Sequence, residues 1–95
     1  MNTLVDNNGK AIGEYIPTSA IARAVEFDDD MMHVSLVDGR VISVPLVWFP
    51  RLSGATTSQR ENYEISPAGI GIHWPDIDED LSVAGLMAGV DLRAA

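Results

Sequence analysis

The sequence predicts an α+β fold, in which a three-stranded antiparallel meander is followed by a C-terminal hairpin and accompanied by two or three short helices. Three observations favour this class. Apolar and polar residues alternate with a period of two over residues 20–46 and again over residues 63–74. Between these regions lie one proline, Pro50, and a capping-box pattern, which are typical of short helices. The 95 residues suffice for one domain with a modest core.

Residues 1–19 precede the alternating pattern. Asn8-Gly9 suits a type I′ turn, and short apolar pairs lie on both sides of it. Two isolated strands are only marginally stable, however. Residues 1–19 are therefore either an extra hairpin or a flexible leader, residues 20–90 form the single small domain, and residues 91–95 form a tail.

The first two strands of the meander are predicted at residues 20–27 and 31–37. In the first strand, the odd-numbered positions should share one face and the even-numbered positions the other. In the second strand, Met32, Val34 and Leu36 should share a face. This alternation is typical of strands that bury one side.

The third strand is predicted at residues 41–46, with Ile42 and Val44 on one face. Asp38-Gly39 stands between two strand-like runs, which is a strong signal for a hairpin. The first three strands therefore form a meander without a crossover.

Two short helices are predicted after the meander. Pro50 suits the first position of a helix, where its missing N–H is not needed, and Gly54 suits the end. Thr56 and Gln59 have the spacing of a capping box, so a second helix should begin at Thr57.

The C-terminal part predicts a hairpin and a last helix. Ile70, Ile72 and Trp74 should share one face of the hairpin's second strand. Asp78 is a favourable N-cap, and acidic residues in the first turn suit the helix dipole. Gly89 is a suitable stop.

Composition disfavours several function classes. With 14 acidic and 6 basic residues, the formal charge of −8 does not suit direct nucleic-acid binding, which depends on neutralising phosphates. The absence of cysteine excludes disulfides and thiolate chemistry. No apolar run is long enough to cross a membrane, and the first residues do not resemble a signal peptide. We therefore expect a cytoplasmic protein, whose acidity suits either solubility or a basic protein partner.

Four motifs stand together between about residues 21 and 89: DGR, P-L-x-WFPRL, AT-x-x-QR and GIHWPDIDED-[LI]-SV-x-GL. With these motifs the chain closely resembles the small bacterial family catalogued as domain of unknown function 2442. The resemblance implies a small α+β fold with an antiparallel sheet and short helices, and it implies no established activity. The first 19 residues are longer than the usual lead-in, and the helix-turn-helix domain of some relatives is absent.

The resemblance also implies a genetic context. Relatives are often one half of a two-gene pair with a small protein of domain of unknown function 4160, and such pairs resemble toxin–antitoxin modules. The implied function is a non-enzymatic, antitoxin-like module that binds a small basic protein. The alternatives are a self-associating accessory domain, in which the strand at residues 20–27 is an exposed edge, and thirdly a small metal-binding protein or enzyme.

Two surfaces are candidates for partner binding. The first contains Trp48, Phe49 and Arg51, because tryptophan and arginine are enriched at binding hot spots. The alternative for this segment is a hydrophobic plug, with Arg51 clamped onto a carboxylate of residues 76–80. The second surface is the acidic helix start, and Arg40 is a further candidate whose alternative is pairing with a nearby acid. The expected partner-binding residues are Trp48, Phe49, Arg51, Arg40, Asp76, Asp78, Glu79 and Asp80.

Metal binding and catalysis are not expected. The pattern D-x-D-x-D at 76–80 begins like an EF-hand loop, but Leu81 and Met87 occupy the positions that require glycine and glutamate. His73 beside these acids allows a looser metal site, although a charged helix start explains them more simply. His33 and His73 are available as bases, yet no serine lies in a G-x-S-x-G context. We expect no catalytic residue, no cofactor and no metal.

Overall fold

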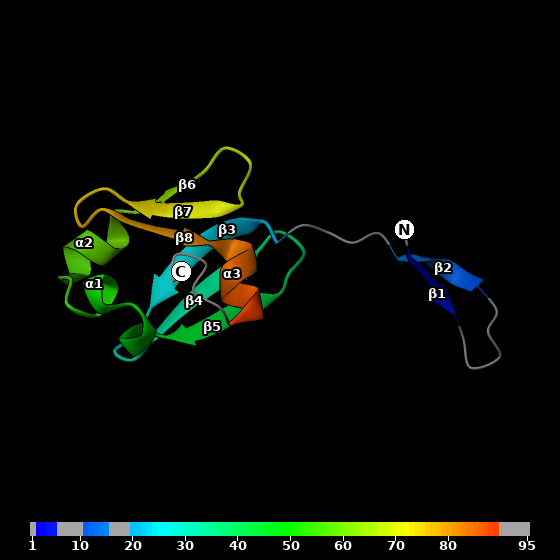
Figure 1. The fold of residues 1–95 in the computed structure, drawn as a ribbon, viewed down its shortest axis with the longest axis horizontal. Coiled ribbons are helices and arrows are strands. Elements are labelled where there is room, and N and C mark those ends of the chain that lie inside the picture. The colour runs from blue at the N-terminus through cyan, green and yellow to red at the C-terminus, as the bar shows by residue number, and fades with distance from the viewer. Residues whose placement is uncertain (1, 6–10, 16–19, 90–95) are drawn as a thin grey trace.

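The computed structural model describes residues 2–5, 11–15 and 20–89 (Figure 1). Strands β1 (Asn2–Val5) and β2 (Ala11–Tyr15) pair antiparallel. The predicted turn at Asn8-Gly9 and the predicted tail at 91–95 lie outside the described residues. The division of the chain into leader, domain and tail therefore stays a prediction.

The predicted meander is confirmed. Strands β3 (Ala22–Phe27), β4 (Met31–Leu36) and β5 (Val41–Pro45) form an antiparallel sheet in the order β3-β4-β5. The even-numbered residues of β4 are buried, as the alternation predicts, and the odd-numbered residues are half-buried on the other face. One side of this sheet thus forms a wall of the core.

Strand β3 departs from simple alternation at a β-bulge. Ala22 pairs with Leu36, but the next register pair joins Ala24 to Ser35, so Arg23 is an extra residue in β3. The prediction that the odd-numbered positions share one face is therefore wrong. The bulge shifts the alternation by one residue and leaves Arg23 exposed.

Short helices follow the meander. A 3₁₀ helix, η1 (Leu46–Trp48), leads into α1 (Pro50–Ser53), which begins at a proline and ends at a glycine as predicted. Helix α2 (Thr57–Glu61) has the predicted capping box. The Gln59 backbone N–H donates to Thr56 Oγ1 over 3.1 Å, and the Thr56 backbone N–H donates to Gln59 Oε1 over 2.9 Å.

A second antiparallel sheet contains β6 (Glu64–Ile65), β7 (Gly71–Trp74) and β8 (Glu79–Ser82) in that order. Strands β6 and β7 are the predicted C-terminal hairpin. Ile70 was expected on the buried face of this hairpin, but it precedes β7 and is 56% exposed. Strand β8 was not predicted.

The last helix begins later than the acidic pattern predicts. Helix α3 (Val83–Ala88) has Ser82 as its N-cap, whose Oγ accepts the backbone N–H of Gly85 over 3.2 Å. Asp78, the predicted N-cap, instead lies in the turn between β7 and β8 with φ 50°. The predicted stop is confirmed, because Gly89 is a left-handed C-cap with φ 71°. The acidic helix start is therefore wrong, and the run is a turn and a strand.

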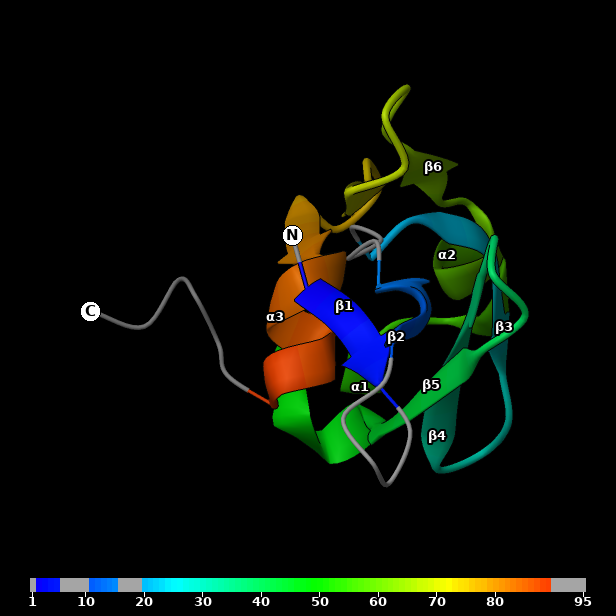
Figure 2. The same ribbon diagram turned by 90° about the vertical axis from the view of Figure 1, so that its right-hand side faces the viewer.

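The two larger sheets are joined near the start of β3. The Ala22 backbone N–H donates to the Gly69 carbonyl over 2.7 Å, and the Val25 backbone N–H donates to the Tyr63 hydroxyl over 3.2 Å. Gly69 has φ 74°, and a Cβ there would lie 2.5 Å from Ile21 Cγ2, so this close approach requires glycine. Both views place α3 against one face of the β3–β5 sheet (Figures 1 and 2).

The core lies between these layers. The buried apolar residues are Ala20, Ala22, Val25, Met32, Val34, Leu36, Val44, Leu46, Phe49, Leu52, Ile72, Trp74, Leu81, Val83 and Leu86.

In the described part of the chain, no helix is long and apolar enough to cross a membrane.

Candidate functional site

The predicted hot-spot segment is divided between core and surface. Phe49 is 5% exposed and Leu52 is fully buried, so the hydrophobic-plug interpretation is right for these two residues. Trp48 is 53% exposed and the adjacent Val47 is 76% exposed. The Trp48 and Phe49 rings contact edge to face, with centroids 6.5 Å apart. Phe49 is therefore not an exposed binding residue, because it closes the core, whereas Trp48 faces solvent.

Arg51 links this segment to the acidic run. Its Nη1 donates a hydrogen bond to the backbone carbonyl of Asp78. The predicted carboxylate clamp is therefore wrong in its acceptor, although Arg51 does reach the predicted run. Helix α1 and the turn between β7 and β8 lie at the same end of the molecule (Figure 1). The two surfaces that the sequence predicted as alternatives, the segment at 48–51 and the acidic run at 76–80, are therefore neighbours.

The acidic run contributes exposed and buried carboxylates. The Asp76 carboxylate accepts a hydrogen bond from Asn62 Nδ2 over 3.0 Å and is exposed. Asp80 pairs across the strands with His73, with Nδ1 and Oδ1 2.7 Å apart. Glu79 is 1% exposed and faces the core, so its expected place on a binding surface is wrong. The alternation of β8 turns Glu79 inward and Asp80 outward.

We call Val47, Trp48, Arg51, Asp76 and Asp78 the tip surface. All five residues are exposed. The surface combines an apolar anchor with carboxylates, which is the combination expected of a site for a basic protein.

Arg40 does not belong to the tip surface. It lies in the turn between β4 and β5, at the other end of the sheet from α1 (Figure 1). Its Nε and Nη2 both lie 2.8 Å from Asp38 Oδ2, and its backbone N–H donates to Asp38 Oδ1 over 3.0 Å. These contacts, the backbone N–H above all, lower the pKa of Asp38. The geometry matches the alternative interpretation, in which Arg40 pairs with a neighbouring acid.

One histidine connects a carboxylate to a hydroxyl on the outer face of the meander. His33 Nε2 lies 2.8 Å from Asp28 Oδ2, and His33 Nδ1 lies 2.6 Å from Ser43 Oγ. The hydrogen bond from His33, followed by those from the backbone N–H groups of Asp30 and Met31, lowers the pKa of Asp28 to about 2. Asp28 and Ser43 are exposed and His33 is half-buried; Asp28 follows β3 directly, and His33 and Ser43 lie opposite each other on β4 and β5.

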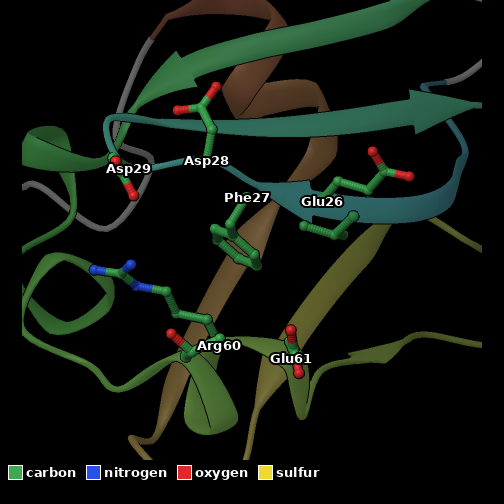
Figure 3. A pocket seen from close by; sticks show the side chains of 8 residues that line it. Glu26, Phe27, Asp28, Asp29, Arg60 and Glu61 are labelled. Carbon is green, nitrogen blue, oxygen red and sulfur yellow. The ribbon is translucent and has the colours of Figure 1, made fainter.

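Sequence reasoning missed a cleft of about 460 Å³ between the free side of β3 and helix α2 (Figure 3). Its two walls lie far apart in the sequence, so no local pattern predicts it. The only local signal was the density of acids around Phe27. The lining residues are Val25, Glu26, Phe27, Asp28, Asp29, Thr57, Arg60 and Glu61.

A second cleft, of about 550 Å³, lies along the second sheet and includes Ile70, His73 and Asp80. Neither cleft is lined by His33 or Ser43. Among the residues that the structure describes, no group of three or more histidines and acids is arranged to hold a metal ion.

Comparison with known proteins identifies relatives without a known activity. The fold is similar to the crystal structure of a protein of unknown function from Rhodospirillum rubrum, with 33% identity and a TM-score of 0.67 over 77% of this chain and 90% of that one. It is also similar to the solution structure of an uncharacterized protein from Chromobacterium violaceum, with 28% identity and a TM-score of 0.63 over 73% of this chain and 65% of that one. No curated protein matches.

The sequence model of one family matches residues 22–91, which is most of the chain and includes the meander, the tip surface and both clefts. The protein therefore belongs to the family of proteins of unknown function DUF2442.

Proposed function

We propose that the protein is a cytoplasmic, non-enzymatic protein-binding module, the antitoxin-like half of a two-gene pair, and that its partner is a small basic protein. The observation that carries this proposal is the exposure of Trp48 on the tip surface. A tryptophan that is 53% exposed offers a large area to bury on binding, and Val47 beside it adds to that area.

The charge of the chain supports a basic partner. Acidic residues outnumber basic residues 14 to 6. Arg51 and Arg60 are engaged by backbone carbonyls rather than by carboxylates, so they do not form ion pairs with the acids near them. A basic partner would be attracted by this field and would then be retained by Trp48, so that charge sets the association rate and the aromatic residue sets the dissociation rate.

The alternatives have weaker support. Strand β3 is an edge of its sheet, as a self-associating domain would need. Two of its outward N–H groups, those of Ala22 and Val25, already donate to Gly69 and Tyr63. For an enzyme, the Asp28–His33–Ser43 contacts resemble a nucleophile with its base, but Asp28 alone of the three lines a described cleft, and neither the Ser43 hydroxyl nor His33 does.

Affinity measurements with matched variants test the proposal. The basic protein that co-purifies with the tagged chain from its native cells is identified, produced separately and titrated calorimetrically. Trp48→Ala should raise the Kd about 30-fold, the loss typical of a hot spot. Ile70→Ala, an equally exposed apolar residue away from the tip surface, should change it less than about twofold.

Equal effects of the two variants would reject Trp48 as the anchor. Co-purification of no basic protein, with light scattering showing a symmetric oligomer whose size depends on concentration, would reject the proposal in favour of self-association.

A further inference from the structure

We infer that the cleft between β3 and α2 receives an arginine or lysine side chain from an extended basic segment of the partner; this inference rests on the proposed function and assigns the partner a second contact, separate from Trp48.

The cleft has an aromatic wall. The Phe27 side chain extends from β3 toward α2 (Figure 3). Its ring meets Trp74 edge to face, with centroids 6.4 Å apart and an interplanar angle of 66°. This contact holds the ring in place while part of it stays accessible. An aromatic face beside negative charge is a favourable environment for a cationic side chain.

The cleft also carries negative charge that no neighbouring cation neutralises. Asp29 and Glu61 are exposed, and no lysine or arginine of the described residues forms an ion pair with them. The one basic lining residue, Arg60, donates Nε to the Leu52 carbonyl over 2.8 Å and Nη2 to the Ser53 carbonyl over 2.9 Å. Its guanidinium is directed away from the Phe27 ring (Figure 3).

The register of β3 adds an independent feature, which points to a peptide. The Asp28 N–H donates to the Met31 carbonyl, toward β4, while the Val25 N–H donates to Tyr63 on the opposite side. Because N–H groups alternate along a strand, the Phe27 N–H and C=O face the same side as those of Val25, away from β4. That side borders the cleft. The Ala22 and Val25 N–H groups are already bonded, so the main-chain contact is confined to Phe27, where an extended segment can form hydrogen bonds at this one residue and place one side chain in the adjacent pocket.

These features together select the occupant. The Phe27 main chain matches an extended backbone, and the Phe27 ring with Asp29 and Glu61 matches a long cationic side chain. A volume of about 460 Å³ falls in the range of sites that enclose small ligands. An acidic or purely apolar segment would leave these carboxylates without a partner.

Nuclear magnetic resonance with small probes tests the cleft without the partner. The ¹⁵N-labelled chain is titrated with N-acetyl-arginine amide and, as a matched uncharged probe, with N-acetyl-norleucine amide. The arginine probe should give saturable shifts at Phe27, Thr57 and Glu61 and slow the hydrogen exchange of the Phe27 amide. The norleucine probe should shift these signals at least fivefold less at equal concentration, because it lacks the charge.

Variants that remove carboxylate charges show which acids bind the arginine probe. Asp29→Asn with Glu61→Gln should weaken the arginine probe at least fivefold, because the two substitutions remove the negative charge that lines the cleft beside Phe27. Glu64→Gln, which removes an exposed acid outside this cleft, should leave its affinity unchanged. Equal shifts with both probes, shifts spread evenly over the exposed acids, or an unchanged affinity in the double variant would each overturn the inference.

The partner distinguishes this inference from the proposed function. If Trp48→Ala weakens binding of the basic partner but the Asp29→Asn, Glu61→Gln double variant does not, the inference fails and the proposed function stands. If both variants weaken partner binding, the Trp48 variant at the tip surface and the double variant at the cleft, the inference is supported. If the arginine probe binds the cleft but no basic protein binds the chain, the proposed function fails and the partner contact inferred here fails with it.

Discussion

The two acidic turns of the molecule, between β3 and β4 and between β7 and β8, are held in opposite ways. The first turn is closed by its own aspartate. Asp28 Oδ1 accepts the backbone N–H groups of Asp30 and Met31 over 2.9 and 2.7 Å. The second turn has one long local hydrogen bond, from the Ile77 N–H to the Trp74 carbonyl over 3.4 Å, and is otherwise held by distant residues: Arg51 donates to the Asp78 carbonyl and Asn62 donates to the Asp76 carboxylate.

The difference shows that similar residues encode turns by local or by distant contacts. The hydrogen-bond partners of the Asp28 carboxylate lie two, three and five residues along the chain, whereas the side chains that donate to the second turn lie 27 and 14 residues away. A turn of the first kind should form whenever its strands do. A turn of the second kind should depend on the packing of α1, α2 and the core, and this dependence can be tested.

Trp74→Ala should have the largest effect on the second turn and on the whole fold. Trp74 is fully buried directly before that turn, its Nε1 donates to the Arg60 carbonyl over 3.0 Å, and its ring contacts Phe27. Removing a buried tryptophan costs about 3–5 kcal/mol of unfolding free energy. Denaturant titration should show this loss, and amide exchange should accelerate more at Asp78 than at Met31.

Trp48→Ala is the matched control, because it removes the same side chain from an exposed position. It should change the free energy of unfolding by less than about 0.5 kcal/mol. Each variant keeps one tryptophan, so fluorescence follows both unfolding transitions. Equal losses in the two variants would contradict the division of the tryptophans between core and surface.

The same contrast explains how much of the fold was predictable. The meander followed from alternation and from Asp38-Gly39, which are local signals. Strand β8 was not predictable in this way, because aspartate and glutamate are disfavoured in strands and favoured at helix starts. Pairing with β7 overrides that preference, and burial of Glu79 and Leu81 on alternate positions accompanies it.

Asp78→Gly should stabilise the second turn modestly. Asp78 has φ 50°, a left-handed conformation that costs a residue with a Cβ roughly 1–2 kcal/mol, less for aspartate than for most. Glycine removes this strain but adds entropy to the unfolded chain, so the net gain should be about 0.5 kcal/mol. A higher denaturant midpoint with an unchanged m-value is the expected result.

Asp29→Gly provides the comparison in the first turn. Among the described residues, Asp78 alone combines a side chain with positive φ, so glycine relieves no such strain at Asp29. We expect a loss of about 0.5 kcal/mol from the added unfolded-state entropy. A gain in both turns would show that backbone conformation does not distinguish them.

The candidate site was less predictable than the fold, for three physical reasons. Trp48 and Phe49 are adjacent and both aromatic, so hydrophobicity alone does not show which one the core takes. Arg51 was expected to find a carboxylate, but a guanidinium also satisfies a backbone carbonyl, which no sequence pattern marks. The cleft depends on β3 meeting α2, a contact that only the tertiary fold creates.

The smallest expected effect is a change in the pKa of Asp28, which tests whether the first turn is held by local contacts alone. The pKa of Asp28 is lowered from its ordinary value of 3.8 to about 2, first by His33 and then by the backbone N–H groups of Asp30 and Met31. Because the folded state depresses this pKa, the resulting stabilisation is present above pH 3.8 and is lost as the pH falls toward 2.

His33→Ala should raise the pKa of Asp28 only part of the way to 3.8, because both backbone N–H donors remain. A ¹³C titration of the Asp28 carboxyl measures this directly. An unchanged pKa would contradict any contribution from the His33 side chain, and the turn would be closed by its backbone N–H groups alone. A full return to 3.8 would mean that the imidazole, and not the backbone, holds the carboxylate. In that case the first turn would depend on a side chain from the next strand. Both turns would then be held by side chains from other elements, and they would differ only in how far along the chain those side chains lie.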